Sequence, residues 1–160
     1  MKNSKNAFTM IELVFVIVIL GILAAIAVPH FAATRIDAQI TKGKSDVASI
    51  RSAIVSERQS RLIKGDSKWI TQLHSSATSY FDGNGTSILL MYGITPENKD
   101  GHWYGQGTSG SAFTYKYKLE GTDNKFAYNP TTSSITVDGV SVPPGGFVCV
   151  SGTNCANLTR

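Results

Sequence analysis

Charge is scarce in this sequence, and one long N-terminal block lacks it almost entirely. Charged residues make up 16% of the chain, whereas ordinary soluble proteins carry about 25%. Residues 13–28 contain no charged or strongly polar side chain, and Glu12 is the single charged residue in positions 8–28. A helix that is apolar on every side must be buried in lipid or among similar helices, so this block is not the surface of a soluble globule.

The sequence also lacks the spaced motifs of common enzymes and metal sites. No G-x-S-x-G, phosphate-binding glycine loop or H-E-x-x-H is present, and the three histidines have no ligand or triad spacing. Residues 82–86 (DGNGT) are similar to the start of a calcium loop, but Gly93 stands where that loop needs an acid. We therefore expect no enzyme, no metal site and no cofactor, with calcium as the one cofactor left open.

Cysteine is nearly absent, because the chain has only Cys149 and Cys155. Two cysteines alone do not make a structural zinc site. The export-like N-terminus places the rest of the chain in an oxidising compartment, so we expect a disulfide between them, with free thiols as the alternative. A bridge that closes so small a loop stabilises the fold by about 2 kcal/mol.

What the N-terminus does contain is a helix long enough to cross a membrane. At 1.5 Å per residue, residues 8–28 span about 31 Å, close to the ~30 Å hydrocarbon core. Lys2 and Lys5 precede them and favour a cytoplasmic N-terminus. A secretory signal peptide ending at residues 25–27 (AIA) and a plain membrane anchor both fit this pattern. Neither gives a role to Glu12, whose carboxylate weakens insertion.

Residues 7–13 (AFTMIEL), the apolar run and Pro29 resemble the N-terminus of type IV pilins and type II secretion pseudopilins. In that family a prepilin peptidase removes a short basic leader, and the new terminal residue, usually Phe, is N-methylated. The resemblance covers about residues 5–31. It places the cut between Ala7 and Phe8 and makes Phe8 the methylated residue. The family usually has Gly before the cut, and here Ala7 stands in that place.

The same resemblance implies a role for three further residues. Glu12 would pair with the terminal amine of a neighbouring subunit and so set the register of assembly, because an unmatched charge in an apolar core is costly. The helix would kink or unwind between Gly21 and Pro29, where its propensity is lowest.

The partners implied by the resemblance are copies of this chain or other pilin-like subunits in a filament, the prepilin peptidase, an inner-membrane assembly platform and the lipid bilayer. The location implied is a single-pass inner-membrane protein with a cytoplasmic N-terminus and a periplasmic head, which later enters a pilus or pseudopilus. The alternative is a membrane-anchored or secreted ligand-binding protein that uses the aromatic residues 102–104. The residues do not separate type II secretion from a type IV or competence pilus.

After Pro29 the pattern becomes amphipathic. Apolar residues recur at helical spacing and form a narrow stripe, made of Ile36, Ile40, Val47, Ile50 and Ile54. Gly43 occupies one stripe position, and we expect it to be a weak point of the helix. Residues 35–64 carry seven basic and three acidic side chains. These bases are not interleaved with aromatics, so we expect a solvated face and no nucleic-acid partner.

The chain therefore divides into four predicted segments: a leader (1–7), a membrane or filament-core helix (8–29), the amphipathic half of the same helix (30–65) and a globular head (66–160). Alternating apolar and polar residues predict antiparallel strands in the head, at 112–119, 125–129, 134–138 and 147–150. We expect a short helix over residues 67–81 with Ser67 as its N-cap, and a loop over residues 94–110. A long helix against such a sheet is an α+β, pilin-like fold.

Overall fold

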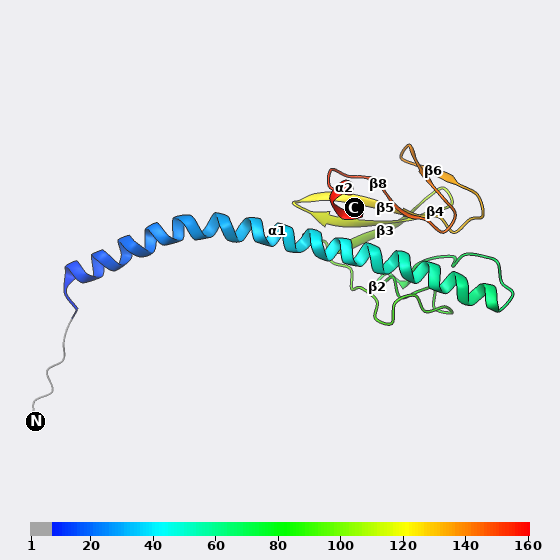
Figure 1. The fold of residues 1–160 in the computed structure, drawn as a ribbon, viewed down its shortest axis with the longest axis horizontal. Helices are drawn as coiled ribbons and strands as arrows, with labels where there is room; N and C mark the ends of the chain where they lie inside the picture. Colours follow the sequence, from blue (N-terminus) through cyan, green and yellow to red (C-terminus); the bar gives the residue numbers. More distant parts are fainter. Residues whose placement is uncertain (1–7) are drawn as a thin grey trace, which may run out of the picture. The chain divides into compact units, whose positions relative to one another are not determined.

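The computed structural model describes residues 8–160, and the predicted leader with Ala7 lies outside the described residues. The fold is α+β, as predicted: one long helix, α1 (Met10–Ile63), is followed by an antiparallel sheet (Figure 1). The chain forms two compact units, divided between Asp37 and Ala38. The second unit holds the C-terminal part of α1 and the whole head.

A glycine stops α1 where the sequence predicts a stop. Gly65 takes a left-handed φ of 82°, which costs glycine nothing. The Gly65 N–H donates to the Leu62 carbonyl at 3.0 Å, and the Asp66 N–H donates to the Arg61 carbonyl at 2.9 Å. This pair of bonds is a Schellman motif, and it satisfies carbonyls that the helix end would leave unpaired.

The main sheet has four antiparallel strands in the order β3-β4-β5-β8. Their bounds are Trp103–Ser109, Ala112–Leu119, Thr122–Tyr128 and Phe147–Ser151. The register pairs Tyr115 with Phe126 and Phe126 with Cys149, so one face of the sheet carries a row of large side chains. This face meets α1, and the strand predicted at 112–119 is confirmed with those bounds.

Aromatic side chains fill the core between the sheet and the second unit's part of α1. The helix contributes Val47, Ile50 and Ile54, each at most 2% exposed. The head contributes buried rings, namely Phe81, Trp103, Tyr115, Tyr117, Phe126, Tyr128 and Phe147. Their ring contacts are mostly tilted or edge-on, the geometry that aromatic pairs prefer.

Several side-chain hydrogen bonds fasten α1 to the sheet and its loops. Tyr117 Oη donates to the Gln39 carbonyl at 2.7 Å, and Trp103 Nε1 donates to Asp46 Oδ2 at 3.0 Å. From the helix side, Lys42 Nζ donates to the Gly101 carbonyl at 2.6 Å and Arg51 Nε donates to the Phe147 carbonyl at 3.0 Å. These bonds lie along the helix from residue 39 to residue 51.

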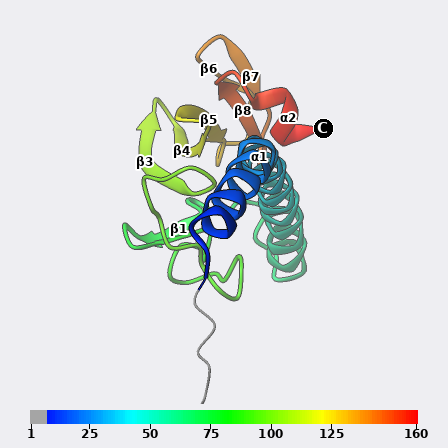
Figure 2. The ribbon, with the colours of Figure 1, turned by 90° about the vertical axis from the view of Figure 1, so that its left-hand side faces the viewer.

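The second face of the sheet is covered as well. Strands β6 (Ile135–Val137) and β7 (Val140–Val142) form a hairpin beyond β5 and β8 (Figure 2). Val137 and Val142 pack there against Ala112, Ala127 and Val150. The strand predicted over residues 134–138 is present as β6, but the sequence analysis does not predict β7, which has only three residues.

The helix predicted over residues 67–81 is wrong. The segment is irregular, apart from two short strands, β1 (His74–Ser76) and β2 (Ser79–Tyr80). Its backbone bonds go to distant tyrosines: the Leu73 N–H donates to Tyr115 Oη at 3.2 Å, and Tyr128 Oη donates to the Ile70 carbonyl at 2.8 Å. Ile70 and Leu73 are buried, and bonds to tyrosines of the sheet hold their backbone in place without a helix.

The loop predicted over residues 94–110 is also wrong in its second half. Residues 103–109 form β3, whose irregular register between Tyr104 and Gly107 opposite β4 marks a bulge. Gly105 lies in this bulge with a φ of 60°, a conformation suited to glycine. The glycines at 105 and 107, which suggested a loop, thus lie in an irregular edge strand.

Gly43 is not a weak point but the site of a close approach. A Cβ at this position would lie 2.6 Å from Leu158 Cδ2 and 2.9 Å from Tyr117 Cε1. Leu158 belongs to α2 (Cys155–Thr159) and is 1% exposed. The glycine therefore lets the C-terminal helix and the sheet close on α1.

We expect Gly43→Ala to lower the free energy of unfolding of the head by about 1–3 kcal/mol, because the added methyl overlaps packed atoms. Urea unfolding of the full chain in detergent, followed by the fluorescence of buried Trp103, measures the change. Gly21→Ala is the matched control, since no heavy atom lies within 4 Å of its Cβ position. Equal stability of the two variants would contradict the packing role.

A pH dependence is expected from Asp46. Burial raises the pKa of its carboxyl above the ordinary value of 3.8, although the bond from Trp103 and the charge of Lys42 oppose the shift. A raised folded-state pKa means that the ionised carboxylate costs stability, and this cost appears as pH rises through the folded pKa.

Asp46→Asn keeps an acceptor for Trp103 without the charge. This variant should be at least as stable as the native chain near neutral pH. Urea unfolding of both chains, from acid to neutral pH, measures the difference in the free energy of unfolding. A clearly lower free energy of unfolding for the variant at neutral pH would contradict the expectation.

Candidate functional site

The first half of α1 is an apolar rod whose side chains are left open. Met10–Val28 has a mean hydropathy of 3.1, and none of it is buried within the chain. Its large apolar side chains range from 41% exposed at Ile19 to 85% at Met10. By length and composition it is the one helix among the described residues that could cross a membrane.

The free energy gained by removing this apolar rod from water exceeds the cost of burying the Glu12 carboxylate with it. Each Leu, Ile or Val side chain removed from water contributes about 1.5–3 kcal/mol. A carboxylate at mid-membrane costs about 2.5–3.5 kcal/mol, and less near an end. Glu12 lies in the first turn of α1, so its cost is outweighed several times over by the apolar residues that follow.

Glu12 is held by the start of its own helix. The Glu12 N–H donates to Thr9 Oγ1 at 3.3 Å, while Glu12 Oε2 accepts from both the Thr9 N–H and Thr9 Oγ1, each at 3.4 Å. The Thr9 carbonyl accepts the first helical bond, from Leu13, at 3.2 Å. This reciprocal arrangement is a capping box, which satisfies helix N–H groups that would otherwise be unpaired.

Thr9 is a residue that the sequence prediction missed. The signal was present, since a Thr followed three residues later by Glu before an apolar run is the sequence pattern of a capping box. The box uses Oε2, and Glu12 Oε1 has no hydrogen-bond partner among the described residues. Within residues 8–160, one carboxylate oxygen of Glu12 thus has no partner at the head of the rod, four residues after Phe8, which is 78% exposed.

Gly21 and Pro29 do not interrupt the helix in this structure. The helical assignment runs through both positions without a break. Gly21 has no heavy atom within 4 Å of its Cβ position, so no close contact within the chain requires a glycine there. Unwinding between these two residues during assembly stays a prediction.

The disulfide expected between Cys149 and Cys155 is present. It joins β8 to the first residue of α2, with the Cα atoms 5.6 Å apart. The turn between them is anchored by a hydrogen bond from the Asn154 N–H to Asn124 Oδ1 at 2.9 Å. The bridge and this bond hold α2 where Leu158 reaches Gly43.

The loop that is similar to a calcium loop uses its oxygens internally. The Asp82 carboxylate accepts from the Ser75 N–H at 2.8 Å and from the Ser75 hydroxyl. Burial opposes ionisation of Asp82, yet these bonds hold the pKa of its carboxyl below the ordinary value. Asn84 Oδ1 accepts from the Ser87 N–H at 2.8 Å. Across residues 8–160, no three His, Cys, Asp or Glu side chains gather as a metal site.

The aromatic residues 102–104 are not brought together as a ligand site. Trp103 is fully buried in the core. Tyr104 bonds to Asp123 on the outer face of the sheet, and His102 Nε2 lies 3.5 Å from Glu97 Oε2. Trp103 and Tyr104 are successive residues of β3 and point to opposite faces of the sheet, so the three side chains do not line one site.

Comparisons with known proteins agree with the sequence pattern. Residues 2–28 match the family model described as the prokaryotic N-terminal methylation motif. The chain is 30% identical over 112 residues to a fimbrial protein of Pseudomonas aeruginosa, which covers 62% of this chain and 64% of the relative. It thus spans less than two thirds of that relative's length.

Two shorter matches are to a type II secretion protein and to a type IV fimbrial protein. The chain is 40% identical over 53 residues to type II secretion system core protein G of Pseudomonas aeruginosa, covering 33% of this chain and 37% of the relative. It is 41% identical over 54 residues to type IV major fimbrial protein FimA of Dichelobacter nodosus, covering 34% and 35%. No solved structure matches this chain significantly.

Proposed function

We propose that the chain is a type IV pilin or pseudopilin, as its methylation motif and its similarity to fimbrial and type II secretion proteins support, and that it is a structural subunit, not an enzyme, of a type IV pilus-like filament or a type II secretion pseudopilus. One observation carries the proposal: an apolar rod that its own chain leaves uncovered begins with a capped carboxylate. Many copies packed through their rods would cover the apolar side chains and give Glu12 a partner.

Processing comes first in the proposed sequence of events. A prepilin peptidase cuts between Ala7 and Phe8 on the cytoplasmic side, and Phe8 is N-methylated. The precursor spans the inner membrane once through the apolar part of α1, with its head in the periplasm, where the Cys149–Cys155 bridge can form. An assembly platform in the inner membrane then moves the subunit into the filament.

The capping box suggests how Glu12 acts before and during assembly. In the single subunit, Thr9 and the helix N-terminus stabilise the carboxylate, which favours its presence at the membrane interface. In the filament, the free Oε1 pairs with the amine of Phe8 in a neighbouring copy. A charge pair in an apolar core penalises wrong register more than it adds stability, so the pairing selects correctly placed subunits.

The stretch between Gly21 and Pro29 is the proposed place where α1 adapts to the filament. Gly costs about 1 kcal/mol and Pro about 3 kcal/mol inside a helix, relative to Ala. Open space around Gly21 leaves the backbone free to change without displacing neighbouring side chains of the same chain.

The mature N-terminus tests the family assignment directly. We expect mass spectrometry of native material to find a chain that begins with N-methylated Phe8. A chain that begins at Val28 would indicate release by a signal peptidase, and a chain that retains Met1 would indicate a plain anchor. Either result would overturn the proposed processing.

A pair of variants separates the charge of Glu12 from its capping role. Glu12→Gln keeps acceptors for the cap but removes the charge, so filament yield should fall about tenfold or more, as expected when an ion pair loses one partner in an apolar core. Thr9→Val removes the hydroxyl and keeps the charge, so it should assemble better than Glu12→Gln. Sheared filaments and membrane-held subunits are quantified separately. A normal filament yield for Glu12→Gln would refute the pairing.

A further inference from the structure

The exposed apolar side chains of the head gather in two neighbouring regions. Within residues 38–160, the large apolar side chains that are at least half exposed lie at the end of α1 and in the loop 88–92. They are Val55, Leu62, Ile63, Ile88, Met91 and Tyr92, from 50% to 89% exposed. Exposed apolar side chains that lie close together on a polar surface are candidates for contact with another molecule.

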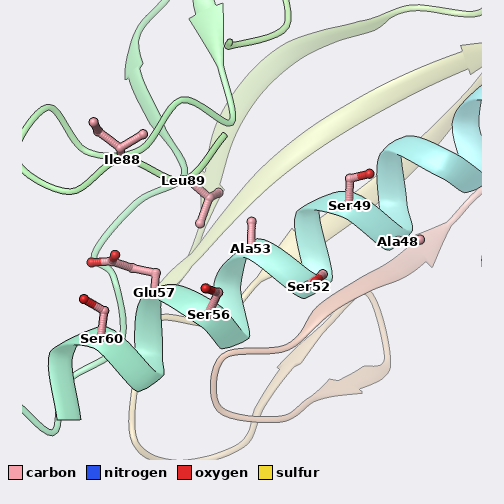
Figure 3. A pocket seen from close by; sticks show the side chains of 9 residues that line it. All are labelled: Ala48, Ser49, Ser52, Ala53, Ser56, Glu57, Ser60, Ile88 and Leu89. Atoms are coloured by element: carbon pink, nitrogen blue, oxygen red, sulfur yellow. The ribbon is translucent and has the colours of Figure 1, made fainter. Parts of the chain in front are cut away.

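A groove of about 730 Å³ runs between α1 and this loop (Figure 3). Small side chains form its helical wall, among them Ser52, Ala53, Ser56 and Ser60, and Ile88 and Leu89 form the facing wall. The one charge in the groove, Glu57, is matched by Arg61, whose Nε lies 2.9 Å from Glu57 Oε1. The groove therefore does not need a charged partner.

The opposite flank of the same helix carries a ridge. Val55 and Leu62 are 52% and 50% exposed, and each follows a groove residue, Ala53 or Ser60, by two positions. Two positions turn the side chain by about 200°, so Val55 and Leu62 point away from Ala53 and Ser60 across α1. Both pairs repeat after seven residues, or about 10.5 Å along the helix.

We propose that the Val55 and Leu62 ridge of one copy packs into the groove of the next copy, over Ala53 and Ser60 and beside Ile88. Large side chains with the same repeat as the small ones fit as knobs into holes. Serine hydroxyls on a helix can bond to the carbonyl four residues earlier, so an apolar ridge can cover them without leaving them unpaired.

This contact is heterologous, because it joins two different surfaces. An assembly built through this contact has a free groove at one end and a free ridge at the other, so further copies can be added, and a helical filament results where the contact does not close into a ring. The parallel orientation of the copies rests on the proposed function, in which the apolar halves of α1 share one direction. The contact is compatible with copies in register or shifted by one seven-residue step.

Cysteine cross-linking in assembled filaments tests the contact. Ser60→Cys with Leu62→Cys reports copies in register, and Ala53→Cys with Leu62→Cys reports the shifted arrangement. The native cysteines are bonded to each other, and ridge and groove thiols lie on opposite flanks of one chain. A short bismaleimide should therefore give a ladder of dimers, trimers and higher oligomers in one of the two double variants.

Single-cysteine variants decide whether the contact joins two different surfaces. Ser60→Cys alone and Leu62→Cys alone should stay monomeric after cross-linking, and strong dimers from either would overturn the heterologous contact. Filaments that form normally while neither double variant gives a ladder would also overturn it, and would leave the filament function intact. A native chain that makes no filament would instead refute the proposed function.

A charge variant covers the case in which the cysteine variants do not assemble. Leu62→Glu should unfold at the same temperature as the native chain in detergent but lower filament yield about tenfold or more, because the carboxylate would be buried without a partner. Gln59→Glu makes the same charge change at an exposed position between ridge and groove and should assemble normally. Equal yields for the two variants would refute the contact.

Discussion

The side chains of Met10–Val28 have no cover within the described chain, and water must be kept from them by lipid or by other copies. This constraint explains the arrangement of the groups at both ends of the rod. The capping box at Thr9 and Glu12 makes a charged group tolerable at its start. The amphipathic stripe that follows gives the same helix a second face, on which a soluble head can fold.

The two halves of α1 are thus governed by different kinds of contact. The first half has mainly apolar surface to offer, which is abundant but not directional, so in the proposed filament its register would depend on Glu12. The second half is bound to the head by side chains with fixed positions, such as Trp103 on Asp46 and Leu158 over Gly43. The proposed ridge-and-groove contact would extend this directional kind of packing from within one chain to between chains.

Local patterns made the helix and most strands predictable, because hydrophobic period, glycine stops and alternation depend on neighbours in sequence. Residues 67–81 were not predictable, since their backbone partners, Tyr115 and Tyr128, lie 42 and 58 residues away from Leu73 and Ile70. The requirement for glycine at position 43 was not predictable either, because it arises only when Leu158 of α2 packs against this position. The proposed processing residues, Ala7 and Phe8, rest on a motif in the sequence, whereas the groove depends on where Ile88 and Leu89 come to lie beside α1.

The bonds that fasten α1 to the head have a mechanical consequence for any subunit under tension. Tyr117, Lys42, Trp103 and Arg51 attach at successive points along the helix, between residues 39 and 51. A pull along the helix axis loads these attachments side by side in shear, so they share the force. A pull across the axis would peel them one at a time. The head is therefore built to resist stretching along the direction in which its helix runs.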